Sequence, residues 1–311
     1  MVNAPPDKPV FRFAPSPNGA LHLGHARSAI LNDIAARQSG GRLLLRMENI
    51  DLARCTPELE HRINEDLDWL GIKFDGPVRR QSDNFDYYRR GLSRLRELGL
   101  VYPSFTTRGE LRQVVAIAEK EGRSWPRDPD GAPHPPASER TRSEEDWATL
   151  MATGRSYAWR LDMDAALERL GSEEITWNES RTLLDEPSVA RFEVRQWGDV
   201  VLARKDTPTS YHLAVVMDDA MQAVTHIVRG RDLYAATAIH RLLQRLLDLP
   251  EPVYHHHALI LDEEGRKLSK SAGSTALSTR RLSGQGAGKI KTLALSAREA
   301  VADFTLPKTS G

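Results

Sequence analysis

The sequence has almost no cysteine and no excess of charge of either sign. Cys55 is the only cysteine in 311 residues, which excludes an intramolecular disulfide and every cysteine-rich zinc motif. Lysine plus arginine and aspartate plus glutamate number 43 each, so the formal net charge is zero and any surface for nucleic acid must be a local patch. We therefore expect a protein of a reducing compartment, the cytoplasm.

Long hydrophobic runs are also lacking. No stretch of about 18 apolar residues occurs, and the first residues, "MVNAPPDKPVF", lack the layout of a signal peptide. We expect neither a membrane segment nor export by that route. With 40% apolar residues the chain can still bury a substantial core.

Hydrophobic patterning predicts an α/β fold. The segments "PVFRFA" and "RLLLRMENI" are predicted as strands on either side of a helix at 25–41, and this order implies a parallel pair. A helix is expected from Thr56-Pro57, a cap followed by proline in the first turn. Later strands are predicted at "RSYAWRLDM", "VVLARK", "THIVRG" and "YHHHALILD", and helices at "DYYRRGLSRLRELGL" and at "LYAATAIHRLLQRLLDL", the latter with Asp232 as its N-cap.

Composition divides the chain into four segments. Residues 8–101 and 141–273 carry the strand and helix patterns and are expected to form the two halves of one domain. Residues 102–140 are rich in proline, aspartate and glycine and are predicted to be an irregular insertion. Residues 274–311 are basic, and we expect a poorly ordered start followed by a helix at "KTLALSAREAVADF".

Two short motifs carry chemical information. His22 and His25 stand three apart in "HLGH" at a predicted helix start, where backbone N–H groups favour an anion, and Gly24 lets a ring or phosphate approach the backbone. Alternatively, one histidine caps the helix and the other packs in an interface, or the two bind a metal, although nothing nearby supplies a third ligand. The second motif, "KLSKS" at 267–271, would by itself be a solvated basic loop.

Together, "HLGH" after the first strand and "KLSKS" after a late strand resemble the paired signature of class I aminoacyl-tRNA synthetases. This resemblance implies a Rossmann-like parallel sheet with helices on both faces and a helical part before the "KLSKS" loop. It implies ATP binding by His22, Gly24, His25, Lys267, Ser269 and Lys270, of which His22, His25 and Lys270 would be catalytic. Nucleotidyltransferases of the pantetheine or nicotinate type share H-x-G-H, but those chains are usually shorter and lack the second motif.

The segments "RFAPSPNG" and "RMENID" resemble the glutamyl and glutaminyl branch of that family. Asn49 stands where this branch commonly has an aspartate, which loses one charge. A guanidinium at Arg229 argues for glutamate, because its bidentate contact with a carboxylate cannot be reproduced by glutamine. These residues also have structural interpretations: Glu48 and Arg229 could form an ion pair, Tyr211 could be a core aromatic, and Arg12 could be a surface charge at a strand end. The glutamate-binding residues implied by the resemblance are Arg12, Ala14, Pro15, Ser16, Glu48, Tyr211 and Arg229.

Within this branch the sequence most resembles the glutamyl-queuosine tRNA(Asp) synthetases, truncated paralogues of glutamyl-tRNA synthetase. "IVRGRDL" fits that group, Val215 stands where the longer enzymes tend to have asparagine, and no room for an anticodon-binding domain follows "KLSKS". The resemblance implies a monomer that activates L-glutamate with ATP and Mg²⁺ and transfers it to queuosine in the anticodon arm of tRNA(Asp). Candidate RNA contacts are Arg79, Arg80, Arg89 and Arg90.

The zinc site common in that family is not reproduced. Ser104, Thr106, His134 and Ser138 stand at the expected ligand positions, and hydroxyls are poor zinc ligands, so we expect no metal there. Losing a zinc site removes folding free energy of about 10 kcal/mol, which predicts a looser insertion. The "HHH" at 255–257 is not predicted to bind a metal either, because strand residues alternate in direction and at most two could converge.

Two further hypotheses remain open. One is aminoacylation of a tRNA 3′ end, as in glutamyl-tRNA synthetase. The other is a degenerate paralogue that binds RNA or protein without catalysis, suggested by the missing zinc ligands, Asn49 and the atypical tail.

Overall fold

The computed structural model describes residues 6–172, 174–261, 275–296 and 299–300. Its main sheet is parallel. β1 (Val10–Phe13) pairs with β2 (Arg42–Met47), and β2 pairs with β3 (Arg79–Arg80). β10 (Val253–His257) pairs in parallel with both β9 (His226–Gly230) and β6 (Glu174–Glu179). The amide of Thr225 donates to the carbonyl of Val10 at 3.0 Å, which places β9 beside β1 and gives the order β6-β10-β9-β1-β2-β3.

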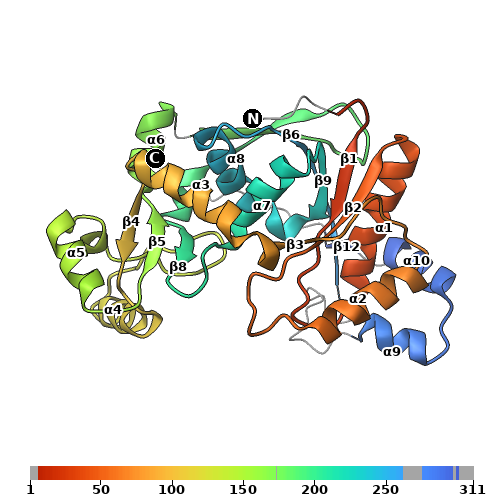
Figure 1. Cartoon of the computed structure of the whole chain (residues 1–311), viewed down its shortest axis with the longest axis horizontal. Helices are drawn as coiled ribbons and strands as arrows, with labels where there is room; N and C mark the ends of the chain where they lie inside the picture. The colour runs from red at the N-terminus through yellow and green to blue at the C-terminus, as the bar shows by residue number, and fades with distance from the viewer. Residues whose placement is uncertain (1–5, 173, 262–274, 297–298, 301–311) are drawn as a thin grey trace.

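Helices cover both faces of this sheet, as predicted (Figure 1). Alternate strand residues separate the two apolar cores: Phe11 and Leu43 belong to one, and Val10 and Leu44 to the other. The first core is closed by α1 (Leu23–Gln38), α2 (Pro57–Trp69), α9 (Leu277–Leu282) and α10 (Ala287–Ser296). The second is closed by α3 (Phe85–Glu97), α7 (Tyr211–Met221) and α8 (Ala236–Leu246).

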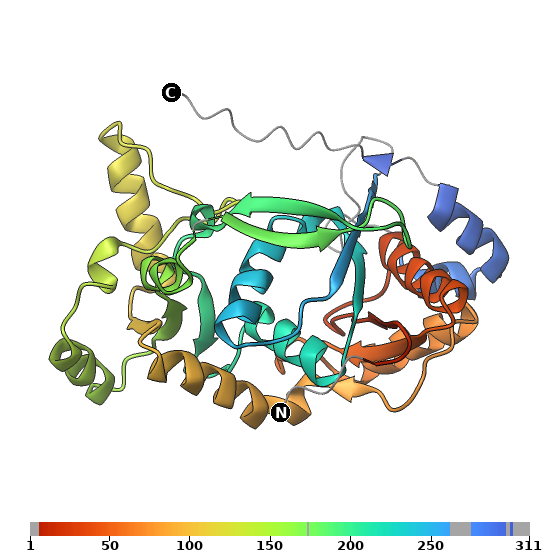
Figure 2. The ribbon, with the colours of Figure 1, turned by 90° about the horizontal axis from the view of Figure 1, so that it is seen from above.

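A second, antiparallel sheet lies at the opposite end of the molecule from α1 and α2 (Figures 1 and 2). It consists of β4 (Val101–Ser104), β5 (Ala158–Leu161) and β8 (Val201–Arg204). Around it lie α4 (Arg108–Lys120), α5 (Glu144–Ala152) and α6 (Met163–Leu170). The remaining elements are β7 (Ser188–Glu193) antiparallel to β6, β11 (Leu259–Ile260) antiparallel to β12 (Glu299–Ala300), and the 3₁₀ turns η1 (Gln81–Asn84), η2 (Ala137–Glu139), η3 (Val194–Trp197) and η4 (Arg231–Leu233).

Two local features differ from expectation. Residues 102–140 contain a full helix, α4, which starts with a capping box: Thr107 accepts from the Glu110 amide and Glu110 accepts from the Thr107 amide. Asp232 is not an N-cap, because it lies within η4 and α8 begins only after Ala235, without a side-chain cap. In the insertion, the composition concealed a local helix start, whereas at Asp232 the local N-cap signal was wrong because a 3₁₀ turn precedes the helix.

The C-terminal segment also differs from the predicted helix at 291–304. α10 begins earlier, at Ala287, and ends at Ser296, after which Glu299–Ala300 pairs with β11. Arg281 of α9 donates to Asp66 and Glu65 of α2, so these bonds hold the C-terminal segment against α2. The "KLSKS" motif lies outside the described residues. Within the described part of the chain, no helix is long and apolar enough to cross a membrane.

Candidate active site

A cavity of about 650 Å³ opens at the carboxyl ends of β1, β2 and β9. Binding at this edge is usual for open parallel sheets, because the loops that follow neighbouring strands meet there. The sequence predictions for Lys267, Ser269 and Lys270 fall outside the described residues. The ten other predicted site residues line this one cavity: Arg12, Ala14, Pro15, Ser16, His22, Gly24, His25, Glu48, Tyr211 and Arg229.

The two histidines of "HLGH" begin helix α1. His22 is the N-cap and its Nδ1 accepts from the Gly24 amide at 3.1 Å, while Nδ1 of His25 accepts from the His22 amide at 3.1 Å. A neutral ring that accepts through Nδ1 carries its proton on Nε2, which can donate to a phosphate oxygen. A Cβ on Gly24 would lie 3.0 Å from the His22 ring, so the glycine first accommodates this ring. The capping alternative is therefore correct for His22 and is compatible with anion binding.

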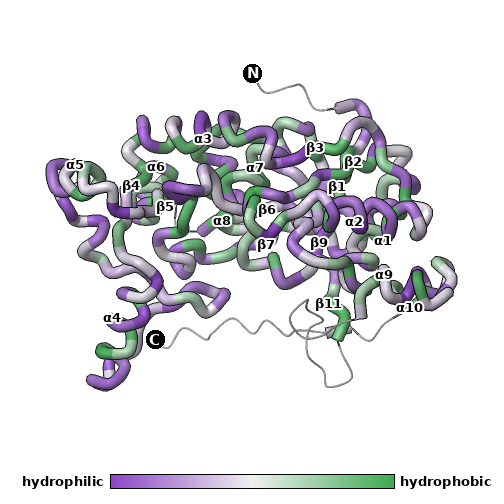
Figure 3. The backbone as a smooth tube through the Cα atoms, turned by 60° about the horizontal axis from the view of Figure 1, so that its bottom comes forward, coloured by the Kyte–Doolittle hydropathy of each residue, from purple (hydrophilic) through white to green (hydrophobic). Residues whose placement is uncertain are grey.

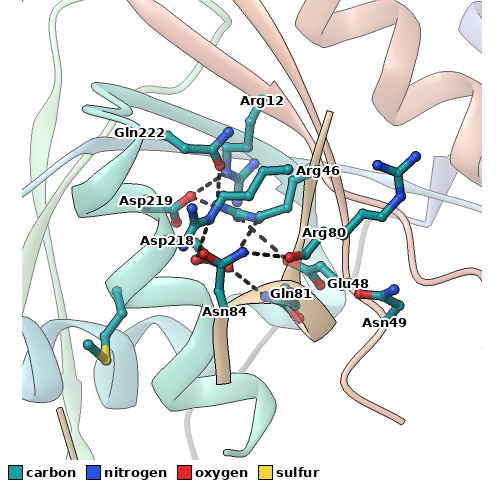
Figure 4. A network of polar contacts seen from close by, with 12 residues as sticks. Arg12, Arg46, Glu48, Asn49, Arg80, Gln81, Asn84, Asp218, Asp219 and Gln222 are labelled. Atoms are coloured by element: carbon teal, nitrogen blue, oxygen red, sulfur yellow. Dashed lines mark hydrogen bonds and ion pairs between the residues drawn. The ribbon is translucent and has the colours of Figure 1, made fainter. Parts of the chain in front are cut away.

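Beneath the cavity lies a buried ion-pair network (Figure 4). Asp219 accepts from Arg12 Nε at 3.1 Å and from Arg46 Nη2 at 2.8 Å. Arg12 is 4% exposed and Arg46 is 0% exposed, so the surface alternative for Arg12 is wrong. The charges of both arginines lower the pKa of Asp219 against the opposing effect of burial. The sequence analysis missed Arg46 and Asp219, although an acid pair in the apolar helix "YHLAVVMDD" is a signal of buried pairing.

Asp218 connects the same network to the next strand and helix. Its carboxylate accepts from Arg79 at 2.7 Å, from Gln81 at 2.9 Å and from the Tyr88 hydroxyl at 2.9 Å. These bonds link α7 to β3, η1 and α3. At the nearby end of β2, Asn49 donates to the Ser82 hydroxyl and accepts from its amide, both at 2.9 Å. Asn49 thus holds η1 in place with a neutral side chain, where an aspartate could not donate.

Glu48 faces the cavity directly after β2. Oε1 of Glu48 lies 3.5 Å from Nη2 of Arg46. Glu48 therefore pairs with Arg46, and the predicted alternative of a Glu48–Arg229 pair is wrong. Burial raises the pKa of Glu48 to about 7, against the lowering effect of Arg46 and Arg12. An incoming cation would lower this raised pKa, because the cation stabilises the charged form of the carboxylate.

Arg229 of β9 is held in a fixed orientation by neutral acceptors. Its Nε donates to His256 Nε2 at 3.1 Å, its Nη1 contacts His240 Nδ1 at 3.0 Å, and its Nη2 donates to Thr237 Oγ1 at 2.8 Å. The side chain is 5% exposed. In the described part of the chain no carboxylate pairs with it directly, and Glu179 reaches it only through His256. An incoming carboxylate would be the first direct counter-ion.

Two histidine chains set this orientation. Glu179 holds Nδ1 of His256 at 2.9 Å, so the proton of that ring lies on Nδ1 and its Nε2 accepts from Arg229. His240 accepts from Arg229 through Nδ1 and therefore donates through Nε2 to His212 Nδ1 at 3.2 Å. Burial lowers the pKa of His212 and of His256 to about 4, and it also lowers the pKa of His240 well below its usual value. All three rings are neutral at pH 7.

Tyr211 closes the cavity at the start of α7. Burial raises the pKa of its hydroxyl to about 12, so the group remains protonated and able to donate. The ring packs edge-on against His212 and His240, with centroids 5.6 and 5.5 Å apart. Tyr211 is thus both a core aromatic and a cavity residue, so the two interpretations of the sequence are compatible.

At the expected zinc positions the structure has a carboxylate instead. Glu139 is 1% exposed and accepts from the amides of Phe105 and Thr106 at 2.5 and 3.2 Å and from Arg142 at 2.7 Å. These bonds tie the end of β4 to η2, which is where ligands at 104, 106 and 138 would have met. His134 instead contacts the carbonyl of Gln196 at 3.2 Å. The residues present do not fit a zinc ion.

The three histidines at 255–257 diverge. His255 contacts the Ser180 carbonyl, His256 contacts Glu179, and His257 contacts the Ala258 carbonyl. Among the residues that the structure describes, no group of three or more histidines, cysteines and acids is placed to hold a metal ion. Absence of a bound metal therefore stays a prediction for the whole chain.

A second cavity of about 680 Å³ adjoins the first. Ser16, Asn18, Glu48 and Tyr211 line both, so the two spaces meet at these residues. Its outer wall comes from α4, from the end of β8 and from the turn at 128–135. The inserted part of the chain thus faces the first cavity across this space.

Comparison with known proteins agrees with this geometry. A glutamyl-Q tRNA(Asp) synthetase from Rhodobacter capsulatus is 47% identical over 91% of this chain and 99% of its own length. A glutamate--tRNA ligase 2 from a Methylobacterium species is 36% identical over 97% of this chain and 63% of its own length. The crystal structure of a glutamate tRNA ligase from Elizabethkingia meningosepticum, in complex with its amino acid, superposes with a TM-score of 0.70 at 30% identity.

That alignment covers 86% of this chain and 53% of the solved one, so the chain spans about half of the longer ligase. The family model described as tRNA synthetases class I (E and Q), catalytic domain, matches residues 9–303. The chain therefore belongs to the class I tRNA synthetases of the glutamate and glutamine group, through their catalytic domain.

Proposed function

We propose that this chain activates L-glutamate with ATP and transfers the glutamyl group to queuosine in the anticodon arm of tRNA(Asp). The observation that carries the glutamate assignment is Arg229, a buried guanidinium that is oriented by neutral histidines and has no direct counter-ion among the described residues. The queuosine assignment is supported by the 47% identity to a relative with that name over nearly the full length of both chains.

In the first step, the α-carboxylate of glutamate attacks the α-phosphorus of ATP, and the bond to pyrophosphate breaks. His22 and His25 would donate through Nε2 to phosphate oxygens at the start of α1, where the helix dipole also favours negative charge. One well-placed donor of this kind is worth roughly 10²–10³ in rate. In the second step, an acceptor hydroxyl attacks the glutamyl carbonyl carbon, and AMP leaves.

The amino acid would be held at both ends. Glu48 would pair with the ammonium group, Arg229 with the side-chain carboxylate, and the Tyr211 hydroxyl would donate to the substrate between them. Glutamine would place an amide against a guanidinium that needs a charge, which gives selectivity for glutamate. Mg²⁺ would neutralise phosphate charge, but the described residues offer no acidic cluster to hold it, so it is expected to arrive with ATP.

Glutamate-dependent ATP–pyrophosphate exchange without tRNA tests the first step. We expect exchange with glutamate alone among the twenty amino acids, and its loss in Arg229→Ala and in Lys270→Ala. A lack of exchange with every amino acid would refute the enzyme and favour the binding-protein hypothesis. Transfer of labelled glutamate to queuosine-containing tRNA(Asp), compared with tRNA(Asp) lacking queuosine, tests the second step.

Aminoacylation of a tRNA 3′ end is the second candidate. It is favoured by the 36% identity to a glutamate--tRNA ligase over 97% of this chain. Charging of tRNA(Glu) would support it over transfer to queuosine. The protein would act as a cytoplasmic monomer. Its catalytic domain would comprise residues 8–101 and 141–273, with 102–140 as an insertion and 274–311 as a tail.

A further inference from the structure

The arginines that the sequence suggested as RNA contacts are engaged within the protein. Arg79 donates to buried Asp218 at 2.7 Å, and Arg80 donates to Glu60 at 2.8 Å. Arg89 pairs with Asp86, and Arg90 lies over the ring of Tyr87. These charges are largely compensated, so a basic patch for RNA must be sought elsewhere.

The second cavity has a wall that carries three arginines. Arg108 and Arg112 stand four residues apart on α4 and line the cavity together, and Arg204 lines it from the end of β8. All three side chains are exposed. In the part of the chain that the structure describes, none of the three forms an ion pair or a side-chain hydrogen bond. Figure 3 shows α4 at the edge of the molecule, clear of the central helices.

The acids of this cavity are already engaged. Asp51 pairs with Arg54 at 2.6 Å, and Asp128 accepts from two amides of its own turn. Asp199 accepts from the Tyr102 hydroxyl at 2.7 Å. Desolvation and the neighbouring charge of Arg108 lower the pKa of Arg204, against the weaker, opposing effect of Asp51. Two guanidiniums thus stand close enough to repel each other, an arrangement that an added anion would stabilise.

The position of the three arginines next to the first cavity indicates which anion they bind. Because the two cavities meet at Ser16, Glu48 and Tyr211, an acceptor that reaches the glutamyl carbonyl can enter through the second cavity. The predicted phosphate contacts of ATP, His22 and His25, line only the first cavity. Single-stranded nucleic acid carries one phosphate per nucleotide, so the backbone next to an inserted nucleotide would pass along the opposite wall.

Given the proposed function, we infer that Arg108, Arg112 and Arg204 bind backbone phosphates of the RNA strand next to the nucleotide that receives glutamate. Planar guanidiniums form bidentate contacts with phosphate, which suits this task. The insertion thus contributes the RNA-binding wall without a zinc ion, because Glu139 fixes its base to β4.

The test compares the triple variant Arg108→Gln, Arg112→Gln, Arg204→Gln with a control that removes three exposed but paired arginines: Arg37→Gln, Arg94→Gln, Arg191→Gln. Binding of a tRNA(Asp) anticodon stem-loop is measured as a function of salt concentration. We expect a 10- to 100-fold weaker Kd for the test variant and a log–log salt slope shallower by about 2, since each contact to a single strand contributes about 0.7. The control should bind like the unmodified protein.

Glutamate-dependent exchange without tRNA separates this inference from the proposed function. The test variant should retain exchange and its KM for ATP within about twofold. An unchanged Kd and salt slope would overturn the inference, whereas a raised KM for ATP with unchanged RNA binding would assign the arginines to the nucleotide and overturn it as well. If the unmodified protein shows no exchange but the stem-loop binding is lost in the variant, the proposed function fails and the RNA site stands.

Discussion

The parallel sheet and the insertion differ in how their charged side chains are buried and paired. Around β1 and β2 the charges are buried and paired: Arg46 and Asp218 are fully buried and Asp219 is 4% exposed. On the cavity side of α4, Arg108 and Arg112 are exposed and have no acid partner among the residues that the structure describes, and one buried carboxylate, Glu139, holds the base. A small substrate requires fixed groups at fixed distances, whereas a long anionic polymer is bound by exposed charges that need only local support.

The substitution Asp219→Asn tests the buried network and should have the largest effect. The asparagine keeps the shape but leaves the buried Arg12 without its acid partner and Arg46 with only its longer contacts to Glu48 at 3.5 Å and Asp218 at 4.0 Å. Losing one side of a buried pair costs about 4 kcal/mol. We expect the free energy of unfolding, measured by urea denaturation, to fall by that amount. Asp33→Asn, which removes the i,i+4 partner of the exposed Arg37, is the control and should change little. A similar small loss for Asp219→Asn would contradict the assigned network.

Glu139→Gln tests the insertion in the same way. An amide cannot accept from two backbone amides and Arg142 through both of its terminal atoms, so we expect a loss of about 3 kcal/mol and faster hydrogen exchange at Phe105 and Thr106. Exchange of β1 and β2 should change far less, which would separate the two regions.

The same carboxylate gives a pH dependence. The pKa of Glu139 is lowered from 4.5 to about 2 by its hydrogen bonds to Arg142, Phe105 and Thr106, which outweigh burial. Its contribution is therefore fully present above about pH 5 and is lost as the pH falls toward 2. Glu139→Gln should weaken this acid dependence, while Asp219, whose pKa is also lowered, still contributes to it. A dependence unchanged by the substitution would show that Glu139 makes no contribution.

A smaller effect is expected on substrate binding at Glu48. Because burial raises its pKa to about 7, the charged form falls from about nine-tenths near pH 8 to about one-tenth near pH 6. The KM for glutamate in the exchange assay should therefore rise about tenfold over this range. The buried histidines, with pKa values of about 4, do not contribute there. Glu48→Gln should bind glutamate weakly and without this dependence; a dependence that survived would assign it elsewhere.

The smallest effect should come from Glu179→Gln. The glutamine loses the charge that fixes the proton of His256, so Arg229 is less well oriented. We expect the KM for glutamate to rise about fivefold, equivalent to about 1 kcal/mol, with kcat and the KM for ATP unchanged. Equal changes in both KM values would indicate a general structural loss instead.

Much of the parallel-sheet region could be predicted from sequence, because its signals are local. Thr56-Pro57 marks the start of α2, and "HLGH" marks the start of α1. The partner of Arg12 could not be predicted, because Asp219 lies 207 residues away: the acid pair in an apolar helix indicates burial but does not specify which cation it meets. Composition misled in the insertion, where proline and glycine dominate and the capping box that begins α4 is only four residues long. The roles of the site residues stay predictions until the assays above are done.

The reciprocal cap formed by His22 and His25 has an evolutionary consequence. The same two rings begin the helix and face the nucleotide side, so replacing either would damage folding even in a descendant that had stopped using ATP. Selection would therefore preserve the motif after the loss of catalysis. Retention of "HLGH" is thus weak evidence that a paralogue is active, whereas retention of Arg229 with its histidine frame, which stabilises no helix end, is the more informative mark of a working enzyme.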